Sequence, residues 1–390
     1  MNTRTYDVVV FGATGFTGRL VAEYLAAEYG SDVRWAMAGR SADKLAAVRD
    51  EIGAPADTPL VVADSADPAS LKAMAEATAA VVTTVGPYQL YGEPLIQACV
   101  EAGTDYVDLC GEPAWMYDII RNYDAPAKAS GARIVLSCGF DSIPFDLGVY
   151  FLQQHAIATS GAPLSRVKGR VRKMKGTFSG GTAASFAETM ARAANEPEVI
   201  NRLRDPFSLV PDFDGPKQPS GMKVIFEEDL NTWSAPFIMA SINTKNVHRS
   251  NALLDHRYGE DFVYDEMFAT GPGENGEQFA NMIANDKSMA ENPPKPGEGP
   301  SKEERETGFY DAMFTGVTAD GTRLTAGVAG DKDPGYGSTS KMIAESALCL
   351  VKNVSRDETP GGVYTPAPAM GEALIGRLQE HAGLTFQIES

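Results

Sequence analysis

A glycine-rich turn between an apolar strand and a helix limits most strongly what this chain can fold into. Residues 6–11 form a short, almost continuous apolar run, which is typical of a strand buried on both faces. The turn follows directly and reads Gly12-Ala13-Thr14-Gly15-Phe16-Thr17-Gly18. Apolar residues at positions 20, 21, 24 and 25 then recur with the spacing of one helix face. This order predicts the first unit of a β/α nucleotide-binding fold.

The alternation of strands and helices continues to about residue 140. Further β-type runs lie at residues 33–38, 60–63, 80–85, 106–109 and 133–137, with helical patterns between them. Ser41 and the pair Asp67-Pro68 are typical helix starts, because they can cap or open the first turn. Strands joined by helical crossovers predict a doubly wound parallel sheet, so we expect an α/β protein with a Rossmann domain over residues 1–145.

The pattern changes after residue 145. Runs at 167–174, 223–226, 309–317 and 322–328 look like antiparallel strands, and Asp320-Gly321 forms a hairpin turn between the last two. We expect a second, α+β domain over residues 146–335, built on a mostly antiparallel sheet and carrying the substrate. Residues 285–305 are rich in Pro, Gly, Lys and Glu and indicate an exposed loop, with a functional lid as the alternative. Helices within residues 336–390 are expected to pack back on the first domain.

The glycines of the turn have separate roles in binding a dinucleotide. The first permits a sharp turn, the second lets a pyrophosphate approach the backbone, and the third lets the helix pack close to the sheet. Phosphates would bind the free N–H groups at the helix start. We therefore predict that this turn holds the cofactor through Gly12, Thr14, Gly15, Phe16, Thr17 and Gly18. The alternative is a structural turn in a domain that binds nothing.

The end of the second strand chooses between NAD and NADP. NAD-specific folds place a carboxylate there for the ribose diol, whereas this chain has Arg40 and Ser41. The Arg40 guanidinium can bind the additional phosphate of NADP, the Ser41 hydroxyl can assist, and Lys44 adds positive charge. We therefore predict NADP(H). Asp64, after the third strand, is placed either to reach the adenine end or to cap a turn.

The loop after the fourth strand is expected beside the nicotinamide ring, because ligands bind past the carboxyl ends of parallel strands. Gly86 and Pro87 give a rigid turn that exposes backbone to the ring. Tyr88 and Tyr91 carry hydroxyls that can donate a proton or orient a substrate carbonyl. We predict these two tyrosines as catalytic candidates, with a packing role as the alternative.

The loops after the fifth and sixth strands carry acids and cysteines. Asp108, Glu112 and Asp141 can shape a substrate pocket, although Asp141 can equally cap the following helix. Cys110 and Cys138 are interpreted as buried apolar residues rather than nucleophiles. The four cysteines include no Cys-x-x-Cys pair and the four histidines are scattered, so no metal site is expected.

Charge and hydropathy exclude several classes of partner. The net charge of −18 repels phosphate backbones, so no nucleic-acid partner is expected. Residues 166–175 are a basic exception, and their alternation predicts a solvated polar face of a strand. No apolar run approaches the roughly 18 residues that a transmembrane segment needs, and no signal peptide is expected. We expect a cytoplasmic protein and leave peripheral contact with a membrane or lipid surface open.

Motifs along almost the whole chain carry a family resemblance. They lie at residues 12–18, 38–40, 85–88, 91–94, 102–108, 111–112, 139–144, 233–254, 335–337 and 361–366. With these motifs the chain resembles the saccharopine dehydrogenase-like family, in its branch of trans-acting enoyl reductases. The resemblance implies an NADP-binding domain joined to a mixed α/β domain.

The resemblance also implies reduction of a carbon–carbon double bond in a polyketide-type lipid precursor, in trans to the synthase. Hydride goes to the β carbon of an enone or enoyl thioester, and a donor such as Tyr88 or Tyr91 stabilises the enolate. The expected partner is thus a small-molecule or lipid-linked substrate presented by a polyketide synthase. A homodimer is left open.

Two other functions compete with this interpretation. The first is a saccharopine-type amino-acid dehydrogenase that reduces an imine, which needs cations for several carboxylates. Arg166, Arg170 and Arg249 are the candidates for those cations. The second is a non-catalytic NADPH-binding sensor or scaffold.

Overall fold

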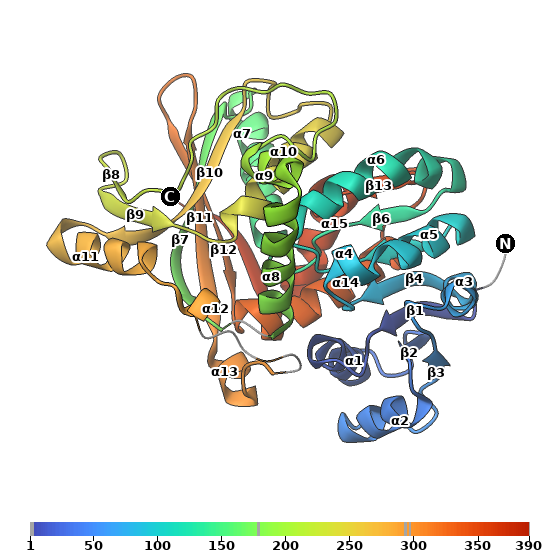
Figure 1. The fold of residues 1–390 in the computed structure, drawn as a ribbon. Coiled ribbons are helices and arrows are strands. Elements are labelled where there is room, and N and C mark those ends of the chain that lie inside the picture. Colours follow the sequence, from blue (N-terminus) through green and yellow to red (C-terminus); the bar gives the residue numbers. More distant parts are fainter. Residues whose placement is uncertain (1–3, 178–179, 292–294, 296–297, 390) are drawn as a thin grey trace.

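The computed structural model describes residues 4–177, 180–291, 295 and 298–389, which build two sheets of seven strands each (Figure 1). The first sheet is parallel, in the order β13-β6-β5-β4-β1-β2-β3. Its strands are β1 (Tyr6–Phe11), β2 (Trp35–Gly39), β3 (Leu60–Val62), β4 (Thr78–Thr83), β5 (Asp105–Val107), β6 (Arg133–Val135) and β13 (Gly362–Tyr364). The predicted parallel α/β sheet is confirmed.

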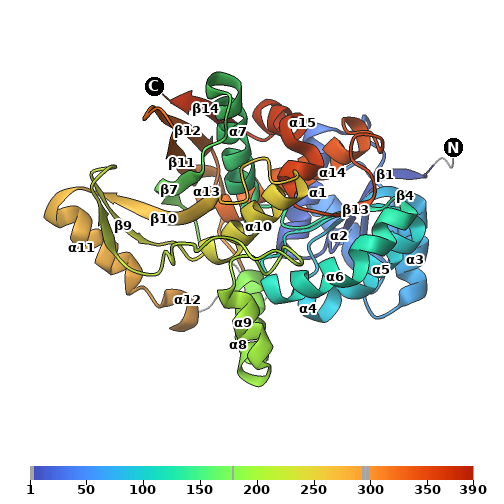
Figure 2. The same cartoon turned by 90° about the horizontal axis from the view of Figure 1, so that it is seen from above.

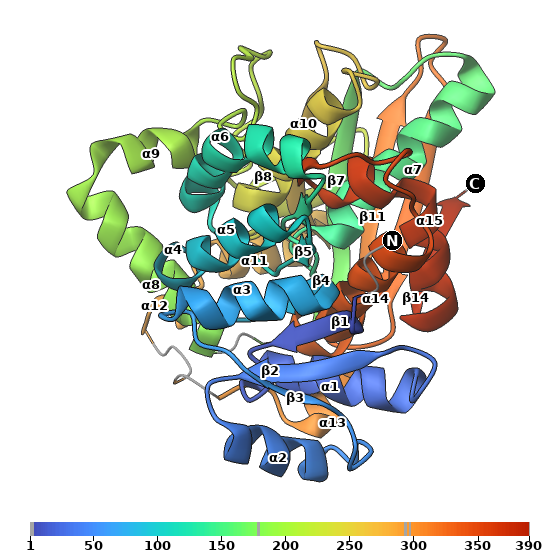
Figure 3. The same ribbon diagram turned by 90° about the vertical axis from the view of Figure 1, so that its right-hand side faces the viewer.

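Strand β1 shows why the apolar run at the start of the chain forms a central strand. Val8 and Val10 enter one hydrophobic core, while Val9 and Phe11 enter a second core on the other face. Because side chains alternate along a strand, only a run that is apolar at every position can be buried on both faces. The covering helices of the first part are α1 (Phe16–Glu28), α2 (Ala42–Glu51), α3 (Pro68–Ala77), α4 (Tyr88–Tyr91), α5 (Glu93–Ala102) and α6 (Pro113–Ser130) (Figure 3).

Two of these helices begin where the sequence predicts. The Ser41 side chain caps α2 by accepting a hydrogen bond from the Lys44 N–H, and the Asp67 side chain caps α3 by accepting from the Ala69 N–H. Pro68 occupies the first turn of α3, where a backbone N–H is not needed.

The second sheet is mostly antiparallel, as predicted, in the order β14-β12-β11-β7-β10-β9-β8. The described exception is the parallel pair of β7 and β10. Its strands are β7 (Arg166–Lys175), β8 (Ile225–Glu227), β9 (Thr232–Pro236), β10 (Val263–Gly271), β11 (Phe309–Val317), β12 (Arg323–Gly330) and β14 (Leu384–Glu389). The helices that follow β6 are α7 (Ile143–Ser160), α8 (Gly180–Asn195), α9 (Pro197–Arg204), α10 (Ala240–Leu253), α11 (Gly273–Ala284), α12 (Ser288–Glu291), α13 (Lys302–Thr307), the π-helix η1 (Pro334–Ser338), α14 (Thr339–Lys352) and α15 (Pro366–His381).

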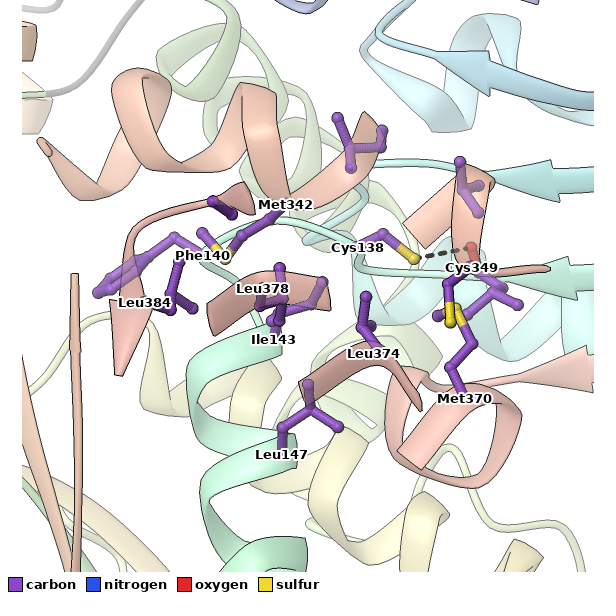
Figure 4. Close-up of a cluster of buried hydrophobic side chains, with 14 of the residues drawn as sticks. Cys138, Phe140, Ile143, Leu147, Met342, Cys349, Met370, Leu374, Leu378 and Leu384 are labelled. Atoms are coloured by element: carbon purple, nitrogen blue, oxygen red, sulfur yellow. Dashed lines mark hydrogen bonds between the residues drawn. The ribbon is translucent and has the colours of Figure 1, made fainter. Parts of the chain in front are cut away.

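The C-terminal part of the chain contributes to both sheets. Strand β13 pairs in parallel with β6 at the edge of the first sheet, and β14 pairs with β12 at the edge of the second. A shared core lies between α7, α14 and α15 (Figure 4). Figure 4 labels Cys138, Cys349 of α14, Ile143 of α7 and Leu378 of α15 among the members of this core. The predicted division at residues 145 and 335 stays a prediction.

The basic stretch of β7 is not the solvated face that its alternation predicts. Arg170 is only 1% exposed and its guanidinium binds Glu227 at 2.6 Å and Asp265 at 3.0 Å. Lys168 binds Glu227 at 2.9 Å, and Arg172 binds Asp311 at 2.6 Å. The alternation does identify one face of a strand, but acids from other strands of the same sheet, β8, β10 and β11, cover that face.

Candidate functional site

The glycine turn closes tightly between β1 and α1. Gly12 has a φ of +90°, which L side chains rarely adopt, and its N–H donates to the Ala38 carbonyl at 3.0 Å. A Cβ on Gly18 would lie 2.1 Å from the Gly12 carbonyl oxygen, so only glycine permits α1 to begin this close to the turn. The predicted roles of these two glycines in the backbone agree with this geometry.

The first turn of α1 is open to an anion. Its cap residue is Gly15, which has no side chain to accept from the helix amides, and no described side chain accepts from the N–H of Phe16, Thr17 or Gly18. Free amides and the positive end of the helix dipole attract phosphate. Thr14, which is exposed, lies beside Gly39 at the end of β2, so the turn and the end of β2 face the same region.

The end of β2 presents a free cation. Arg40 is exposed and forms no ion pair with any residue that the structure describes, so its guanidinium is available to a phosphate. Lys44 is exposed one turn further on, and the Ser41 side chain caps α2 between them. Asp64 accepts a hydrogen bond from the Ala66 N–H at 3.0 Å and so caps the turn after β3, while its placement toward the adenine end stays a prediction.

The two candidate tyrosines of the loop after β4 differ in accessibility. Tyr88 is 5% exposed, and its hydroxyl donates to the Thr83 carbonyl at 3.2 Å and accepts from the Leu109 N–H at 3.1 Å. Tyr91 is 44% exposed, and its hydroxyl has no partner among the described residues. The cis Gly86–Pro87 peptide precedes both. Of the two hydroxyls, that of Tyr91 is the one open to a substrate.

Glu112 holds this loop in place, a function that the sequence did not reveal. Its buried carboxylate accepts from the Tyr88 and Gln89 N–H groups, each at 2.9 Å, and so caps the short helix α4. It also accepts from the Ser185 hydroxyl of α8 at 2.7 Å. Figure 2 shows α8 and α9 projecting from the body of the protein. The Glu112 carboxylate therefore joins the loop after β4 to helix α8.

The acids of the loops after β5 and β6 differ in exposure, because Asp108 is buried whereas Asp141 is partly exposed with a buried Oδ1 atom. Asp108 accepts from the Ser137 N–H at 2.8 Å and from the Cys110 N–H at 3.0 Å, and burial raises its pKa to about 7. Asp141 does not cap α7, whose cap residue is Ser142. Burial also raises the pKa of Asp141 to about 7. Asp108 thus ties two loops together, while Asp141 remains free of such a bond.

A segment that the sequence indicated as an exposed loop covers part of the phosphate turn. A Cβ on Gly299 would lie 2.5 Å from the Phe16 ring, and the Arg305 guanidinium lies 5.6 Å from the centre of that ring. Tyr336 of η1 packs edge-on against Phe16 with ring centres 5.3 Å apart. Figures 1 and 3 both place α13 near α1. Part of residues 285–305 lies outside the described residues.

The arginines that were candidates for binding substrate carboxylates already bind groups of the protein itself. Arg249 is buried and donates to the carbonyls of Leu209 and Val363. Arg166 forms an ion pair with Asp265, which Arg170 also binds. All four cysteines are free and buried, and in the described ranges no three His, Cys, Asp or Glu side chains gather as metal ligands. None of the helices in those ranges has the length and apolar character to cross a membrane.

Comparisons with known proteins identify the domain and the family of this chain. Residues 8–135 match the Saccharopine dehydrogenase NADP binding domain. Rv2449c of Mycobacterium tuberculosis, assigned by name to the trans-acting enoyl reductases, is 42% identical over 98% of this chain and 97% of its own length. A trans-acting enoyl reductase of Mycobacterium ulcerans is 38% identical over 97% of this chain and 96% of its own.

A solved structure supports the fold. The saccharopine dehydrogenase (L-Glu forming) of Saccharomyces cerevisiae has a TM-score of 0.56 and 13% identity, covering 99% of this chain and 100% of that chain. At this identity the likeness concerns the fold alone. The matched domain confirms the prediction of NADP(H) as cofactor.

Proposed function

Because this chain belongs to the family of trans-acting enoyl reductases, we propose that it uses NADPH to reduce a carbon–carbon double bond conjugated to a carbonyl in a polyketide-type lipid precursor. The observation that carries the proposal is the uncapped start of α1 beside the unpaired Arg40, since together they suit a pyrophosphate and a 2′-phosphate. A synthase would present the precursor, as the names of the relatives imply for those proteins.

The cofactor would be held by the residues predicted for it. The amides of Phe16, Thr17 and Gly18 would bind the pyrophosphate, with Gly12, Thr14 and Gly15 shaping the turn, since the Gly15 N–H donates to the Gly12 carbonyl at 2.9 Å. Arg40, Ser41 and Lys44 would bind the adenosine phosphate, with Asp64 shaping the neighbouring turn. Gly86 and Pro87 would face the nicotinamide ring, which supplies hydride when NADPH is bound.

The tyrosines would divide the remaining work. Tyr88 orients the loop, because both hydrogen-bonding directions of its hydroxyl are in use. Tyr91 would donate a hydrogen bond to the substrate carbonyl oxygen, where negative charge develops as hydride reaches the β carbon. Arg166, Arg170 and Arg249 bind groups of the protein and are not free to bind substrate carboxylates. This favours enoyl reduction over reduction of an imine that carries several carboxylates.

A fluorescence titration of NADPH and NADH on the wild type and on Arg40→Ala tests the cofactor assignment. One lost charged hydrogen-bonding group costs about 1.5–3 kcal/mol, so we expect NADPH affinity to fall about 10- to 100-fold and NADH affinity to stay unchanged. Arg204→Ala, an exposed arginine of α9, is the matched control and should bind both nucleotides normally.

The reaction is tested by NADPH oxidation with enoyl thioesters and, in parallel, with imine-forming amino-acid and keto-acid pairs. Oxidation with enoyl thioesters alone supports the proposal. Turnover with the amino-acid pairs alone would establish the dehydrogenase, and binding of NADPH without oxidation by either panel would establish a sensor.

A further inference from the structure

A buried polar cluster lies where the loop after β6 meets the second sheet. Asn246 of α10 donates to the Ser142 hydroxyl at 2.7 Å, directly beside Asp141 in the chain. Asn243, one turn earlier on α10, donates to the Glu266 carboxylate of β10 at 2.9 Å. Residues three apart on a helix share a face, so α10 turns both amides toward Asp141 and Glu266. We call these four residues, Asp141, Asn243, Asn246 and Glu266, the amide–acid cluster.

The amide–acid cluster contains hydrogen-bond acceptors that nothing in the described protein satisfies. Asn243 and Asn246 are fully buried, yet the Oδ1 atom of each lacks a partner, as does the buried Oδ1 atom of Asp141. A buried polar atom without a partner costs about 1–3 kcal/mol. These side chains are therefore better suited to binding a ligand or exchanging a proton than to a structural role. Asp108 differs, because both of its oxygens accept hydrogen bonds.

The pKa values of the two carboxyl groups in the amide–acid cluster are raised toward neutral pH or above it. Burial is the largest cause that raises the pKa of Glu266 to about 8, and the neighbouring Asp265 and Asp141 raise it further. Side chains alternate along β10, so Asp265 points to the other face, where it binds Arg166 and Arg170. Arg166 and Arg170 therefore form their ion pairs on the opposite face of the sheet and do not stabilise the charged form of Glu266 or Asp141.

Asp141 lies at the edge of the sheet where the cofactor is expected. A Cβ on Gly111 would lie 4.0 Å from the Asp141 Oδ2 atom. Gly111 is exposed, and it directly precedes Glu112, which holds the backbone of Tyr88 and Gln89. The Asp141 carboxyl therefore belongs to the same group of loops as the predicted nicotinamide contact, with one oxygen buried and the residue partly exposed.

We propose that Asp141 is the catalytic acid that protonates the α carbon of the substrate after hydride transfer, with Ser142 and Asn246 as positioning residues. The proposal rests on the enoyl reduction proposed above. With NADPH bound, the electron pair of its nicotinamide C–H bond would form the new C–H bond at the β carbon, which leaves NADP⁺, and the π electrons of the double bond move to the carbonyl as an enolate. The enolate pair then forms a bond to the Asp141 proton, and the O–H electrons remain on the carboxylate. Water returns the proton to Asp141.

Two variants separate this role from mere burial of an acid. Asp141→Asn keeps the shape of the side chain and removes the transferable proton. Asp146→Asn is the matched control, because Asp146 of α7 is also buried with a pKa raised to about 7, but its oxygens are bonded to Ser250 and to the Ala367 N–H. NADPH affinity is measured first for each, followed by turnover with an enoyl thioester between pH 6 and 9.

General acids contribute about 10²- to 10⁴-fold to a rate. We expect Asp141→Asn to bind NADPH as the wild type does and to turn over at least about 100-fold more slowly, while Asp146→Asn retains turnover. The wild-type rate should fall about tenfold per pH unit above pH 7, because Asp141 must be protonated, and this limb should be absent from the variant.

The outcomes distinguish the two proposals. Wild-type oxidation of NADPH that is unimpaired in Asp141→Asn overturns the role of Asp141 and leaves the enoyl reductase intact. If the variant does not fold, the pH profile of the wild-type turnover rate tests the proposal by itself. A rate that does not change between pH 6 and 9 overturns the role of Asp141 as the acid. No oxidation of NADPH by the wild type with any enoyl thioester overturns both proposals.

Discussion

The close approach of α1 to the glycine turn makes Gly18→Ala the most direct test of how the cofactor site is built. The new Cβ would lie 2.1 Å from the Gly12 carbonyl oxygen and 2.7 Å from the Gly12 carbonyl carbon. Both are backbone atoms, so no side chain can rotate away, and the start of α1 must move by roughly 1 Å. Overpacking of this kind costs about 1–3 kcal/mol in stability.

The same displacement moves the amides that are proposed to bind the pyrophosphate. Loss of well-aligned hydrogen bonds to a charged group is worth about 1.5–3 kcal/mol, so we expect NADPH affinity to fall about 10- to 100-fold. Denaturant unfolding, followed by circular dichroism, measures the stability change, and a fluorescence titration measures the affinity.

Gly376→Ala is the matched control for Gly18→Ala. Gly376 is an exposed helical residue of α15, and a Cβ there meets no atom within 4 Å. Alanine should therefore stabilise the protein by up to about 1 kcal/mol through helix propensity. The reasoning is refuted if Gly18→Ala unfolds at the wild-type denaturant concentration and binds NADPH with wild-type affinity.

Two further predictions concern buried charge. Arg133 pairs with Asp105 at 2.5 Å and donates to the carbonyls of Leu350 in α14 and of Val354 just after it. Breaking a buried pair costs about 3–5 kcal/mol, so Arg133→Met should lose that much stability in denaturant unfolding, and a loss below 1 kcal/mol would contradict this. Burial raises the Asp146 pKa from 3.8 to about 7, so its contribution to stability is present below pH 4 and is lost as pH rises through 7. The free energy of unfolding of Asp146→Asn should therefore rise relative to that of the wild type by up to about 4 kcal/mol between pH 4 and 9. A difference that stays constant with pH would count against this burial.

The elements that sequence patterns predicted best are those decided by local chemistry. Strand β1 has the predicted bounds, because an unbroken apolar run followed by glycine leaves few alternatives. Strand β13 escaped notice because it has only three residues and is defined by pairing with β6, more than 200 residues earlier. Its sequence contains Gly362 and no β-type run, so the partner strand and not the local pattern determines its structure.

The basic alternation of β7 illustrates a different limit. A period of two identifies a face of a strand, but it does not reveal what lies on that face. The acids that cover it, Glu227 and Asp265, are 57 and 95 residues beyond Arg170. Their positions depend on β8 and β10 joining the same sheet as β7, which the residues of β7 alone do not encode.

The candidate site divides along the same line. The phosphate turn is a local feature of one strand, one turn and one helix, so the sequence pattern alone identifies its residues. The amide–acid cluster joins Asp141 to residues more than 100 positions away on α10 and β10, and no member by itself indicates a site in the sequence.

Helix α10 is buried although polar residues lie on every face, and in the sequence it stands out only as part of the motif at residues 233–254. A polar helix can be buried only where its side chains find partners, so the Asn243 and Asn246 oxygens that lack them mark the part of α10 whose chemistry the fold leaves open.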